Sequence, residues 1–600
     1  MKRFKLAAIA SAASALVLAA PAAAQTQPQP QPQNPTSDGQ PIKRVVVFGD
    51  SLSDGGFFRA VTPLPPGAGR FTTNPDLVSP ELVALRLGLT VNSAYGLNGT
   101  NFAVGGARVT AANGPSIPIT TQINNFLAAG GSFGPNDLVY IQGGGNDFFA
   151  FQAGGSTNNA ILTTAANDLA RQVQRVQAAG AQRIVTLAVQ TGGAPGLQLF
   201  NQTYGAALAS AGVNALYFDT DRLFNEIVAN AASFGITNVT STACLGSSLT
   251  CTPATYRTPN ANETFLLADS VHPSGITQRI QADAIASLIV APEQIGRLAE
   301  AGQSLMRGHT KILEGPMHGA LSAGGSGLRL FGNVGYHYHS SPGSRQQIGL
   351  SERSLLAQLG ADVALSDSLG VGVAGTYSDG DGQFRFNSGG YDVSAWSVTG
   401  YARAALGPLA VGAAATYGSH QYDDITRRVR LTSVTREHRG DTDGTYFAAN
   451  GSVGLMLGGA AVRFGPEAGL SYEKVKLDGY AEDSTQSTAA TFGDQELESL
   501  TGRVGVLATS HGEAPVRVLA RISYERELET EDRSITMRPS GAPITYTSSL
   551  GRLDRDYVSF NLTVGGEIAP RLGVQAGVRG EVERGDGNVV TSFAGLSFRF

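Results

Sequence analysis

The sequence predicts two domains of different class, an α/β domain with a mostly parallel sheet followed by a transmembrane antiparallel β-barrel of about twelve strands. The chain has 600 residues, which is too many for one compact hydrophobic core. In its first half, short apolar runs alternate with helical stretches, as in parallel sheets covered by helices. In its second half, apolar and polar residues alternate in segments of about ten residues.

The chain opens with the features of an export signal. A basic start is followed by the apolar or small residues Leu6 to Ala20, and Ala22 to Ala24 form an A-x-A cleavage site. We therefore expect residues 1–24 to be a cleaved signal peptide. The alternative, a transmembrane anchor, is disfavoured by the Ala-rich segment and the cleavage site. Residues 25–41 are rich in Pro and Gln and form a spacer that cannot bury a core.

Residues 42–290 show the α/β pattern. Continuous apolar runs predict strands buried on both faces at Arg44 to Phe48, Asp137 to Ile141, Arg183 to Val189 and Ala215 to Phe218. Helical stretches alternate with them at Pro80 to Leu87, Asn158 to Ala178, Arg222 to Ala232 and Ile276 to Ile289. This alternation implies right-handed crossovers and a sheet with helices on both sides. Such sheets place active sites beyond the carboxyl ends of their strands.

Residues 291–326 are predicted to link the two domains. Pro292 to Leu313 is expected to be one separate helix, because Pro is favoured in a first turn and the following residues are mostly polar. A barrel of about twelve strands is wide enough to hold such a helix as a plug. We therefore expect the linker helix to lie inside the barrel against charged inner walls.

Residues 327–600 carry the period-two pattern of the barrel. Val518, Ala520 and Ile522 share one face, opposite Arg521 and other polar residues. Lipid offers no partner for backbone amides, so only helices or closed barrels span it, and no stretch here reaches the ~20 apolar residues of a spanning helix. A soluble β-sandwich also alternates, but it does not explain so many strands with charged inner faces or the terminal Phe600. We expect a monomeric barrel surrounded by outer-membrane lipid.

Composition excludes some functions. The net charge is −5 and no Lys/Arg-rich run occurs, so no nucleic-acid partner is expected. The two cysteines, Cys244 and Cys251, lie close together in an exported chain and predict one small disulfide loop. A zinc site there is disfavoured, because His272 is the sole nearby histidine and has another predicted role.

Gly49 to Asp54 follow the first predicted strand directly, and Ser51 lies in the middle of this turn. A Ser on a tight turn leaving a buried strand projects its hydroxyl into the crevice at the carboxyl edge of the sheet. The backbone amides that follow point toward an oxygen attacked by that Ser. By itself a Gly-Asp-Ser turn is also compatible with an ordinary loop.

Asp269 to His272, just before the last predicted helix, supply the partners that a Ser nucleophile requires. An imidazole must take the hydroxyl proton, and a carboxylate must fix the tautomer of that imidazole. His272 is the sole histidine before His309, so a histidine base in this half of the chain must be His272. The alternative for this segment is a surface turn that caps the following helix.

Two glycine-containing blocks are candidates for an oxyanion hole. Asn101 to Ala107 contain the pair Gly105 and Gly106, whose amides can approach a ligand closely. Gly143 to Asp147 follow the second strand, so Asn146 also lies at the carboxyl edge of the sheet. Backbone amides and an Asn side-chain amide are suitable donors to an oxyanion.

These four blocks resemble those of the GDSL (SGNH) hydrolases over roughly residues 43–290. The resemblance implies a flavodoxin-like α/β fold, Ser51 as nucleophile, His272 as base and Asp269 as its orienting carboxylate. It also implies an oxyanion hole formed by the Ser51 amide, Gly106 and Asn146, with Gly106 preferred over Gly105 because of its spacing from Asn101. One departure is that Thr73-Asn74-Pro75 lacks the glycine of the T-N-G-P stretch found in many relatives.

The C-terminal part resembles the translocator of monomeric autotransporters, and the whole is similar to autotransporter esterases whose N-terminal domain stays attached to the barrel. The resemblance implies an enzyme in the bacterial outer membrane that is exposed at the cell surface and hydrolyses esters or lipids. The expected acyl-Ser51 mechanism requires no metal and no cofactor. Two alternatives remain at this stage, an acyltransferase that uses the same acyl-enzyme and a non-catalytic surface adhesin.

Overall fold

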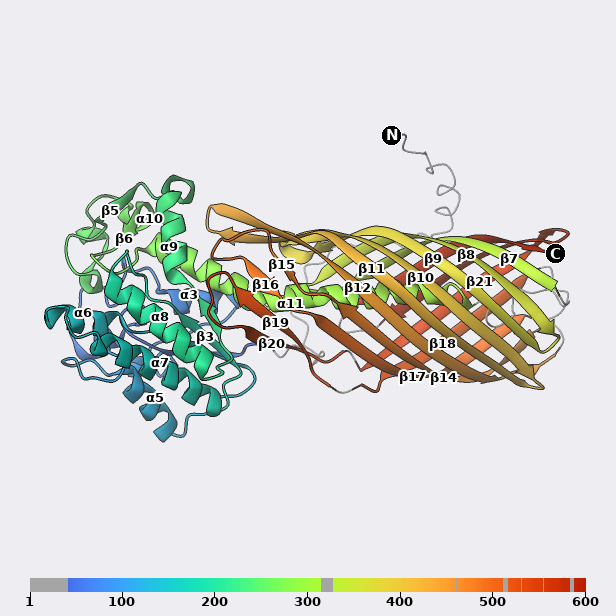
Figure 1. Cartoon of the computed structure of the whole chain (residues 1–600), viewed down its shortest axis with the longest axis horizontal. Helices are drawn as coiled ribbons and strands as arrows, with labels where there is room; N and C mark the ends of the chain where they lie inside the picture. Colours follow the sequence, from blue (N-terminus) through green and yellow to red (C-terminus); the bar gives the residue numbers. More distant parts are fainter. Residues whose placement is uncertain are drawn as a thin grey trace.

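The computed structural model describes residues 41–314, 327–459, 462–510, 516–529, 531–553, 555–582 and 587–600. The predicted signal peptide and all of the spacer except Pro41 lie outside these residues. Figure 1 shows an N-terminal α/β domain beside an elongated barrel, with one long helix running from the domain into the barrel. The two predicted fold classes are therefore confirmed.

The N-terminal domain contains a parallel sheet in the order β1-β2-β3-β4. The strands are β1 (Arg44–Phe48), β2 (Asp137–Ile141), β3 (Arg183–Leu187) and β4 (Leu216–Phe218). Two further strands, β5 (Asn238–Thr242) and β6 (Phe265–Leu267), pair with each other in parallel. The four strands of the main sheet coincide closely with the four predicted apolar runs, because strands buried on both faces are apolar at successive positions.

Helices cover both faces of this sheet. Val45 and Val47 of β1 pack on one side with the core that contains α3, α9 and α11, whereas Val46 and Phe48 pack on the other side with α5, α7 and α8. The helices of the domain are α2 (Phe57–Val61), α3 (Ser79–Arg86), α4 (Ala94–Leu97), α5 (Ile119–Ala128), α6 (Gly145–Ala153), α7 (Ala160–Ala178), α8 (Pro195–Ser210), α9 (Thr220–Ala229), α10 (Ala261–Thr264) and α11 (Gly275–Lys311).

The predicted start of a separate linker helix at Pro292 is wrong. Helix α11 runs without interruption through 37 residues, and Pro292 lies inside it. Proline removes one helical hydrogen bond and disfavours the helical conformation of the preceding residue. Here Ala291 and Ile295 are fully buried in a core to which both the N-terminal domain and the barrel loops contribute. This burial stabilises the helix across the proline, so the predicted boundary at residue 290 falls within one continuous helix.

Among the described residues of the second half, twelve long antiparallel strands form one closed barrel. The last strand pairs with the first, β23 with β7, and β12 pairs with β14. The twelve strands are β7 (Gly327–Ser340), β8 (Leu350–Ser366), β9 (Leu369–Phe384), β10 (Gly389–Leu406), β11 (Leu409–Leu431), β12 (Val434–Leu455), β14 (Val462–Leu477), β17 (Gln495–Ser510), β18 (Arg517–Glu527), β21 (Asp556–Ala569), β22 (Leu572–Val582) and β23 (Asn588–Arg599).

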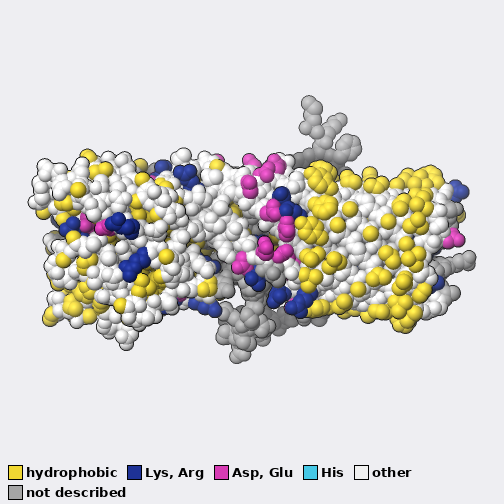
Figure 2. Space-filling view, turned by 60° about the horizontal axis from the view of Figure 1, so that its bottom comes forward, with side chains coloured by type: hydrophobic (Ala, Val, Ile, Leu, Met, Phe, Trp, Pro, Cys, Tyr) yellow, Lys and Arg dark blue, Asp and Glu magenta, His cyan; other side chains and the backbone are white. Residues whose placement is uncertain are grey.

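The faces of the barrel strands follow the predicted alternation. Ile522 points outward and is 60% exposed, whereas its neighbour Arg521 points inward and is 6% exposed. Figure 2 shows hydrophobic side chains gathered on the half of the barrel farther from the N-terminal domain, and charged side chains between that belt and the domain. This distribution is that of a barrel whose apolar belt lies in lipid.

None of the described helices is both long and apolar enough to cross a membrane.

Helix α11 fills the barrel lumen, as predicted. The Arg307 guanidinium donates to a Glu473 oxygen at 2.6 Å, and the two nitrogens of His309 each lie 2.9 Å from a serine hydroxyl, those of Ser397 and Ser378. Closer to the N-terminal domain, the Tyr422 hydroxyl donates to the Leu298 carbonyl of the helix at 2.8 Å. Polar side chains of the helix thus find partners on the inner wall, which satisfies groups that have no access to water.

A second small sheet, which we did not predict, joins the barrel to the N-terminal domain. It consists of β15 (Tyr480–Ala481), β16 (Ala490–Phe492), β19 (Arg533–Pro539) and β20 (Tyr546–Gly551), formed by segments between barrel strands. The backbone of Thr547 exchanges two hydrogen bonds with the Asn214 side chain, at 2.7 and 2.9 Å. The Ser487 amide and hydroxyl both donate to Glu226 at 2.7 Å.

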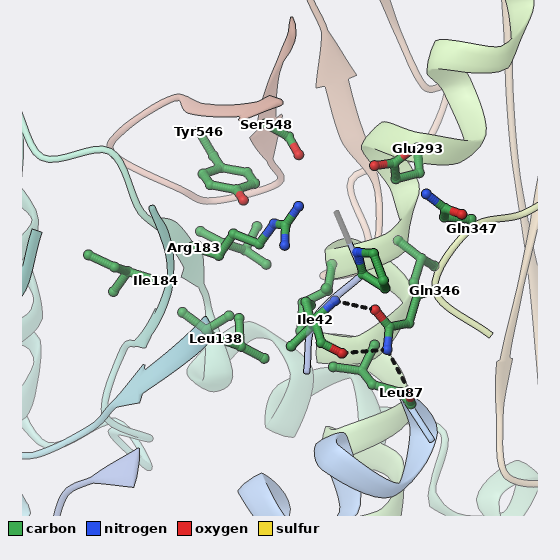
Figure 3. Close-up of a pocket in the computed structure, with 15 residues that line it drawn as sticks. Ile42, Leu87, Leu138, Arg183, Ile184, Glu293, Gln346, Gln347, Tyr546 and Ser548 are labelled. Atoms are coloured by element: carbon green, nitrogen blue, oxygen red, sulfur yellow. Dashed lines mark hydrogen bonds between the residues drawn. The ribbon is translucent and has the colours of Figure 1, made fainter. Parts of the chain in front are cut away.

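Figure 3 shows the small cavity at this junction, about 30 Å³ in volume. It is lined by Ile42, Leu138 and Arg183 from the amino ends of β1, β2 and β3, and by Tyr546 from the small sheet. The side chain of Gln346, in a barrel loop, accepts a hydrogen bond from the Ile42 amide at 2.6 Å and donates one to the Ile42 carbonyl at 2.9 Å. The amino edge of the parallel sheet therefore faces the barrel.

Candidate active site

Ser51 lies on a tight turn that leaves the carboxyl end of β1. The amide and carbonyl of Gly49 are both held by the Gln122 side chain, at 2.9 and 2.8 Å. A Cβ at position 49 would lie 2.9 Å from the Gln142 carbonyl, so this position requires glycine. Contacts with Gln122 and Gln142 therefore fix the conformation of the turn. Ser51 lies at the edge of the sheet and is 8% exposed.

The structure brings Ser51, His272 and Asp269 together. His272 Nε2 lies 2.8 Å from Ser51 Oγ, and His272 Nδ1 lies 2.8 and 2.9 Å from the two oxygens of Asp269. Asp269 and His272 belong to a turn after β6 that is closed by a hydrogen bond from the Ala268 amide to the His272 carbonyl, at 2.7 Å. Two segments separated by 221 positions thus form one chain of hydrogen bonds from hydroxyl to carboxylate.

The surroundings of Asp269 keep it ionised. Burial alone would raise its pKa, but hydrogen bonds with His272 and Ser248 and the charge of His272 lower the pKa below its usual value. One carboxylate oxygen accepts the amides of Val271 and His272, at 3.1 and 3.0 Å. A carboxylate in this position binds the proton-bearing Nδ1 and leaves Nε2 free to accept the Ser51 proton.

The predicted oxyanion donors differ in whether their amide groups are already bonded. The Gly105 amide is occupied, because it donates to Asp54 at 2.8 Å, whereas the amides of Ser51 and Gly106 have no acceptor among residues 41–314. Asn146 uses one amide hydrogen to bond the Ala107 carbonyl at 3.0 Å. Its second amide hydrogen remains available, since an Asn side chain carries two donors. This pattern supports Gly106 rather than Gly105 as the donor.

Asp54 and Asn101 hold the loops around Ser51 together through their side chains, and the sequence did not single out Asp54. Asp54 accepts the amides of Gly56, Phe57 and Gly105, at 2.7 to 2.8 Å. Asn101 donates to the Ser53 carbonyl at 2.8 Å. The role of Asp54 became visible only in the folded structure, because its carboxylate accepts amides from two loops that are distant in the sequence.

Asn74, at the position where the sequence departs from the family pattern, has a structural role. Its side-chain amide donates to the carbonyl of Thr72 at 3.2 Å and to the carbonyls of Arg70 and Ser248, both at 2.9 Å. The loop that lacks the expected glycine is therefore hydrogen-bonded to Ser248, whose amide in turn contacts Asp269.

Burial perturbs two further carboxyls of the Ser51 turn. Burial raises the pKa of Asp50, which precedes Ser51, to about 6, and it raises the pKa of Asp54 to about 6 as well. Asp50 Oδ1 accepts the Leu52 amide at 3.1 Å. Neither carboxyl is within the hydrogen-bond chain that joins Ser51 to Asp269.

The triad opens away from the barrel. The amino ends of β1, β2 and β3 line the junction cavity, and parallel strands all point the same way, so Ser51 at the carboxyl end of β1 lies at the opposite edge. In Figure 1 the elements of that edge, α6, β5 and β6, lie farthest from the barrel. The site therefore faces outward from the end of the molecule.

Comparisons with known proteins agree with this arrangement. Residues 45–285 match the family described as GDSL-like Lipase/Acylhydrolase, and residues 329–579 match the Autotransporter beta-domain. The chain is similar to Esterase EstA of Pseudomonas aeruginosa, with 28% identity over 615 residues that cover 90% of this chain and 93% of that protein. It is also similar to Lipase 1 of Photorhabdus luminescens, with 22% identity over 650 residues that cover 92% and 95% of the two chains.

Among solved structures, the translocator domain of the autotransporter NalP from Neisseria meningitidis aligns with a TM-score of 0.41 and 15% identity, over 50% of this chain and 98% of that one. The family matches to both halves, together with the full-length relatives, identify the whole architecture. The chain belongs to the GDSL-type autotransporter esterases, in which a GDSL-like lipase/acylhydrolase domain is joined to an autotransporter beta-domain.

Proposed function

We propose that the N-terminal domain hydrolyses carboxylic esters through an acyl-Ser51 intermediate, with His272 as base and Asp269 as its orienting carboxylate. The observation that carries this proposal is the continuous hydrogen-bond chain from Ser51 Oγ through both nitrogens of His272 to Asp269. The autotransporter beta-domain places the chain in the outer membrane with the N-terminal domain at the cell surface.

The proposed reaction proceeds in two halves. Ser51 Oγ attacks the ester carbonyl while His272 Nε2 takes its proton, and the amides of Ser51, Gly106 and Asn146 donate to the oxyanion that forms. The ester C–O bond then breaks, and the alcohol leaves with the proton from His272. Water repeats the sequence on the acyl-enzyme and releases the acid. Each oxyanion donor is expected to contribute about 2.7–4 kcal/mol to transition-state stabilisation.

The walls of the site favour esters with an apolar part. The Phe71 ring packs 5.1 Å from the His272 ring, and the Phe58 ring packs 5.7 Å from Phe71. A Cβ at Gly105 would collide with both phenyl rings. These rings therefore lie directly against the glycine segment of the oxyanion hole, where an acyl chain or an apolar alcohol would be bound.

The test is covalent labelling of intact cells with a p-nitrophenyl alkylphosphonate, which a reactive serine attacks with release of nitrophenolate. We expect one label per chain, located on Ser51 by peptide mass spectrometry, and loss of ester hydrolysis by the same cells in proportion to labelling. Label on a different residue would remove Ser51 from its proposed role. Labelling that occurs only after lysis would contradict the outward placement of the site.

Asp50 makes the stability of the N-terminal domain dependent on pH. Because the pKa of Asp50 is raised to about 6 in the folded protein, its contribution to stability is present below the unfolded pKa of ~3.9 and is lost as pH rises through about 6. Replacing Asp50 by Asn keeps an acceptor for the Leu52 amide and removes the buried charge. The variant is expected to be more stable than the wild type by up to about 3 kcal/mol at neutral pH and nearly equal to it at about pH 4.

The measurement is the temperature at which half of the esterase activity is irreversibly lost, after heating at several pH values and assay at one common pH. Asp54, with its pKa also raised to about 6, is unchanged in the variant, so part of the pH dependence should persist. An Asp50→Asn variant that loses activity at lower temperatures than the wild type at neutral pH would contradict the assigned cost of burying this carboxylate.

A further inference from the structure

A short loop closed by a disulfide lies directly behind Asp269. The predicted pairing of Cys244 with Cys251 is confirmed, and both cysteines are buried against Ala268, the residue that precedes Asp269. The Cys244 amide donates to the Ala268 carbonyl at 2.9 Å. The base of the loop is therefore attached to the segment that carries the carboxylate.

Ser248, inside this loop, contacts both members of the Asp269–His272 pair. Its amide donates to Asp269 Oδ2 at 2.9 Å, and its hydroxyl lies 3.2 Å from His272 Nδ1. The other carboxylate oxygen, Oδ1, accepts the amides of Val271 and His272 from its own turn. Among the backbone amides of residues 41–314, Ser248 alone holds Oδ2, so it restricts rotation of the carboxylate from the side that the Asp269 turn does not reach.

The loop is anchored on its other side by the segment that follows α2. The Asn74 side chain donates to the Ser248 carbonyl at 2.9 Å, and the Gly69 amide donates to the Leu249 carbonyl at 3.0 Å. Ser248 itself is fully buried and begins a short 3₁₀ helix, Ser248–Thr250. Its position is thus determined by the disulfide at one side and by Asn74 at the other.

We propose that Ser248 is a positioning residue for the triad and that the Cys244–Cys251 disulfide maintains it in place. This inference rests on the proposed function, because it concerns the carboxylate that orients His272. Without the cross-link, the six residues between the cysteines would sample more conformations, and the Ser248 amide would spend less time against Asp269. Small displacements of catalytic groups have large effects on rate, about a hundredfold for 1 Å.

The test uses the full-length protein in detergent and two variants, Ser248→Ala and the double variant Cys244→Ser with Cys251→Ser. A p-nitrophenyl alkylphosphonate counts the reactive sites, and kcat is expressed per titrated site. We expect kcat per site to fall about three- to tenfold in Ser248→Ala and about ten- to a hundredfold in the double variant, with KM within about twofold of the wild type. Ser247→Ala is the matched control, because within residues 41–314 the Ser247 hydroxyl has one hydrogen bond, which it accepts from the Leu249 amide of the same loop at 3.3 Å.

The count of titrated sites separates positioning from folding. A purely structural role lowers the number of sites and leaves kcat per site unchanged, and that result would overturn the inference. Ser248→Ala removes the hydroxyl at His272 Nδ1 and keeps the amide at Asp269 Oδ2. An unchanged kcat per site in this variant would therefore overturn the role of the hydroxyl, even if the double variant did not fold. An unchanged kcat per site in the double variant would overturn the role of the disulfide in holding the amide. If the wild-type protein itself took up no phosphonate at Ser51, the proposed function would fail, and this outcome is distinct from the failure of the positioning role.

Discussion

Replacing Ser51 by Ala is expected to lower kcat by about 10⁴- to 10⁶-fold, because the acyl-enzyme can no longer form. The fold should be unaffected, since His272 is the one hydrogen-bond partner of the Ser51 hydroxyl among the residues that the structure describes. KM should change little, because the hydroxyl contributes to the transition state more than to substrate binding. The residual rate would come from the oxyanion donors and from binding of the ester.

The measurement is steady-state hydrolysis of a p-nitrophenyl ester by the purified full-length variant. Ser241→Ala, an exposed serine of β5, serves as a control for the substitution itself and should retain wild-type activity. Retention of more than about one per cent of kcat in Ser51→Ala would show that the acyl group is carried by another residue.

Asp269→Asn is expected to lower kcat by about 10³- to 10⁴-fold while preserving the shape of the site. An Asn at this position presents an amide N–H toward His272 Nδ1 and favours the tautomer that carries its proton on Nε2. That nitrogen lies 2.8 Å from Ser51 Oγ and could then no longer accept the serine proton. The effect should fall on kcat, because the tautomer affects proton transfer and not the binding walls.

The Asp269→Asn variant should still be folded and present in the outer membrane, which heat-modifiable migration of the barrel on a denaturing gel would show. Asp367→Asn, which changes an exposed carboxylate in the turn between β8 and β9, is the matched control. A kcat within tenfold of the wild type in Asp269→Asn would mean that another group orients His272. In that case Ser248, whose hydroxyl also faces Nδ1, would be the first residue to examine.

Much of the fold follows from local sequence pattern. The runs around Val46 and Val139 are apolar at every position after the first, because their strands are covered on both faces. They predicted β1 and β2 to the residue. The alternation around Ile522 predicted which side chains face lipid, since a strand reverses its side chains at each step. These patterns report the environment of a residue and can therefore be recognised without knowledge of its partners.

Patterns of this kind did not reveal how the two domains are joined. In the small sheet of β15, β16, β19 and β20, the first two strands have two and three residues and are too short to show periodicity. The sheet forms only where two barrel loops meet. Pro292 predicted a helix boundary from its local preference, but packing of Ala291 and Ile295 in a shared core overrode that preference. Local propensity was outweighed by burial that depends on both domains.

The sequence by itself determined the two fold classes, the disulfide and the three candidates Ser51, Asp269 and His272, because strand-end turns and residue chemistry are local properties. Only the tertiary structure decided that Ser51 and His272 lie 2.8 Å apart, that Gly105 is already bound to Asp54, and that Ser248 stands behind Asp269. It also decided that the site faces away from the barrel. These features depend on which loops, distant in the sequence, lie together at one edge of the sheet. The chain topology determines this arrangement, and local periodicity carries no information about it.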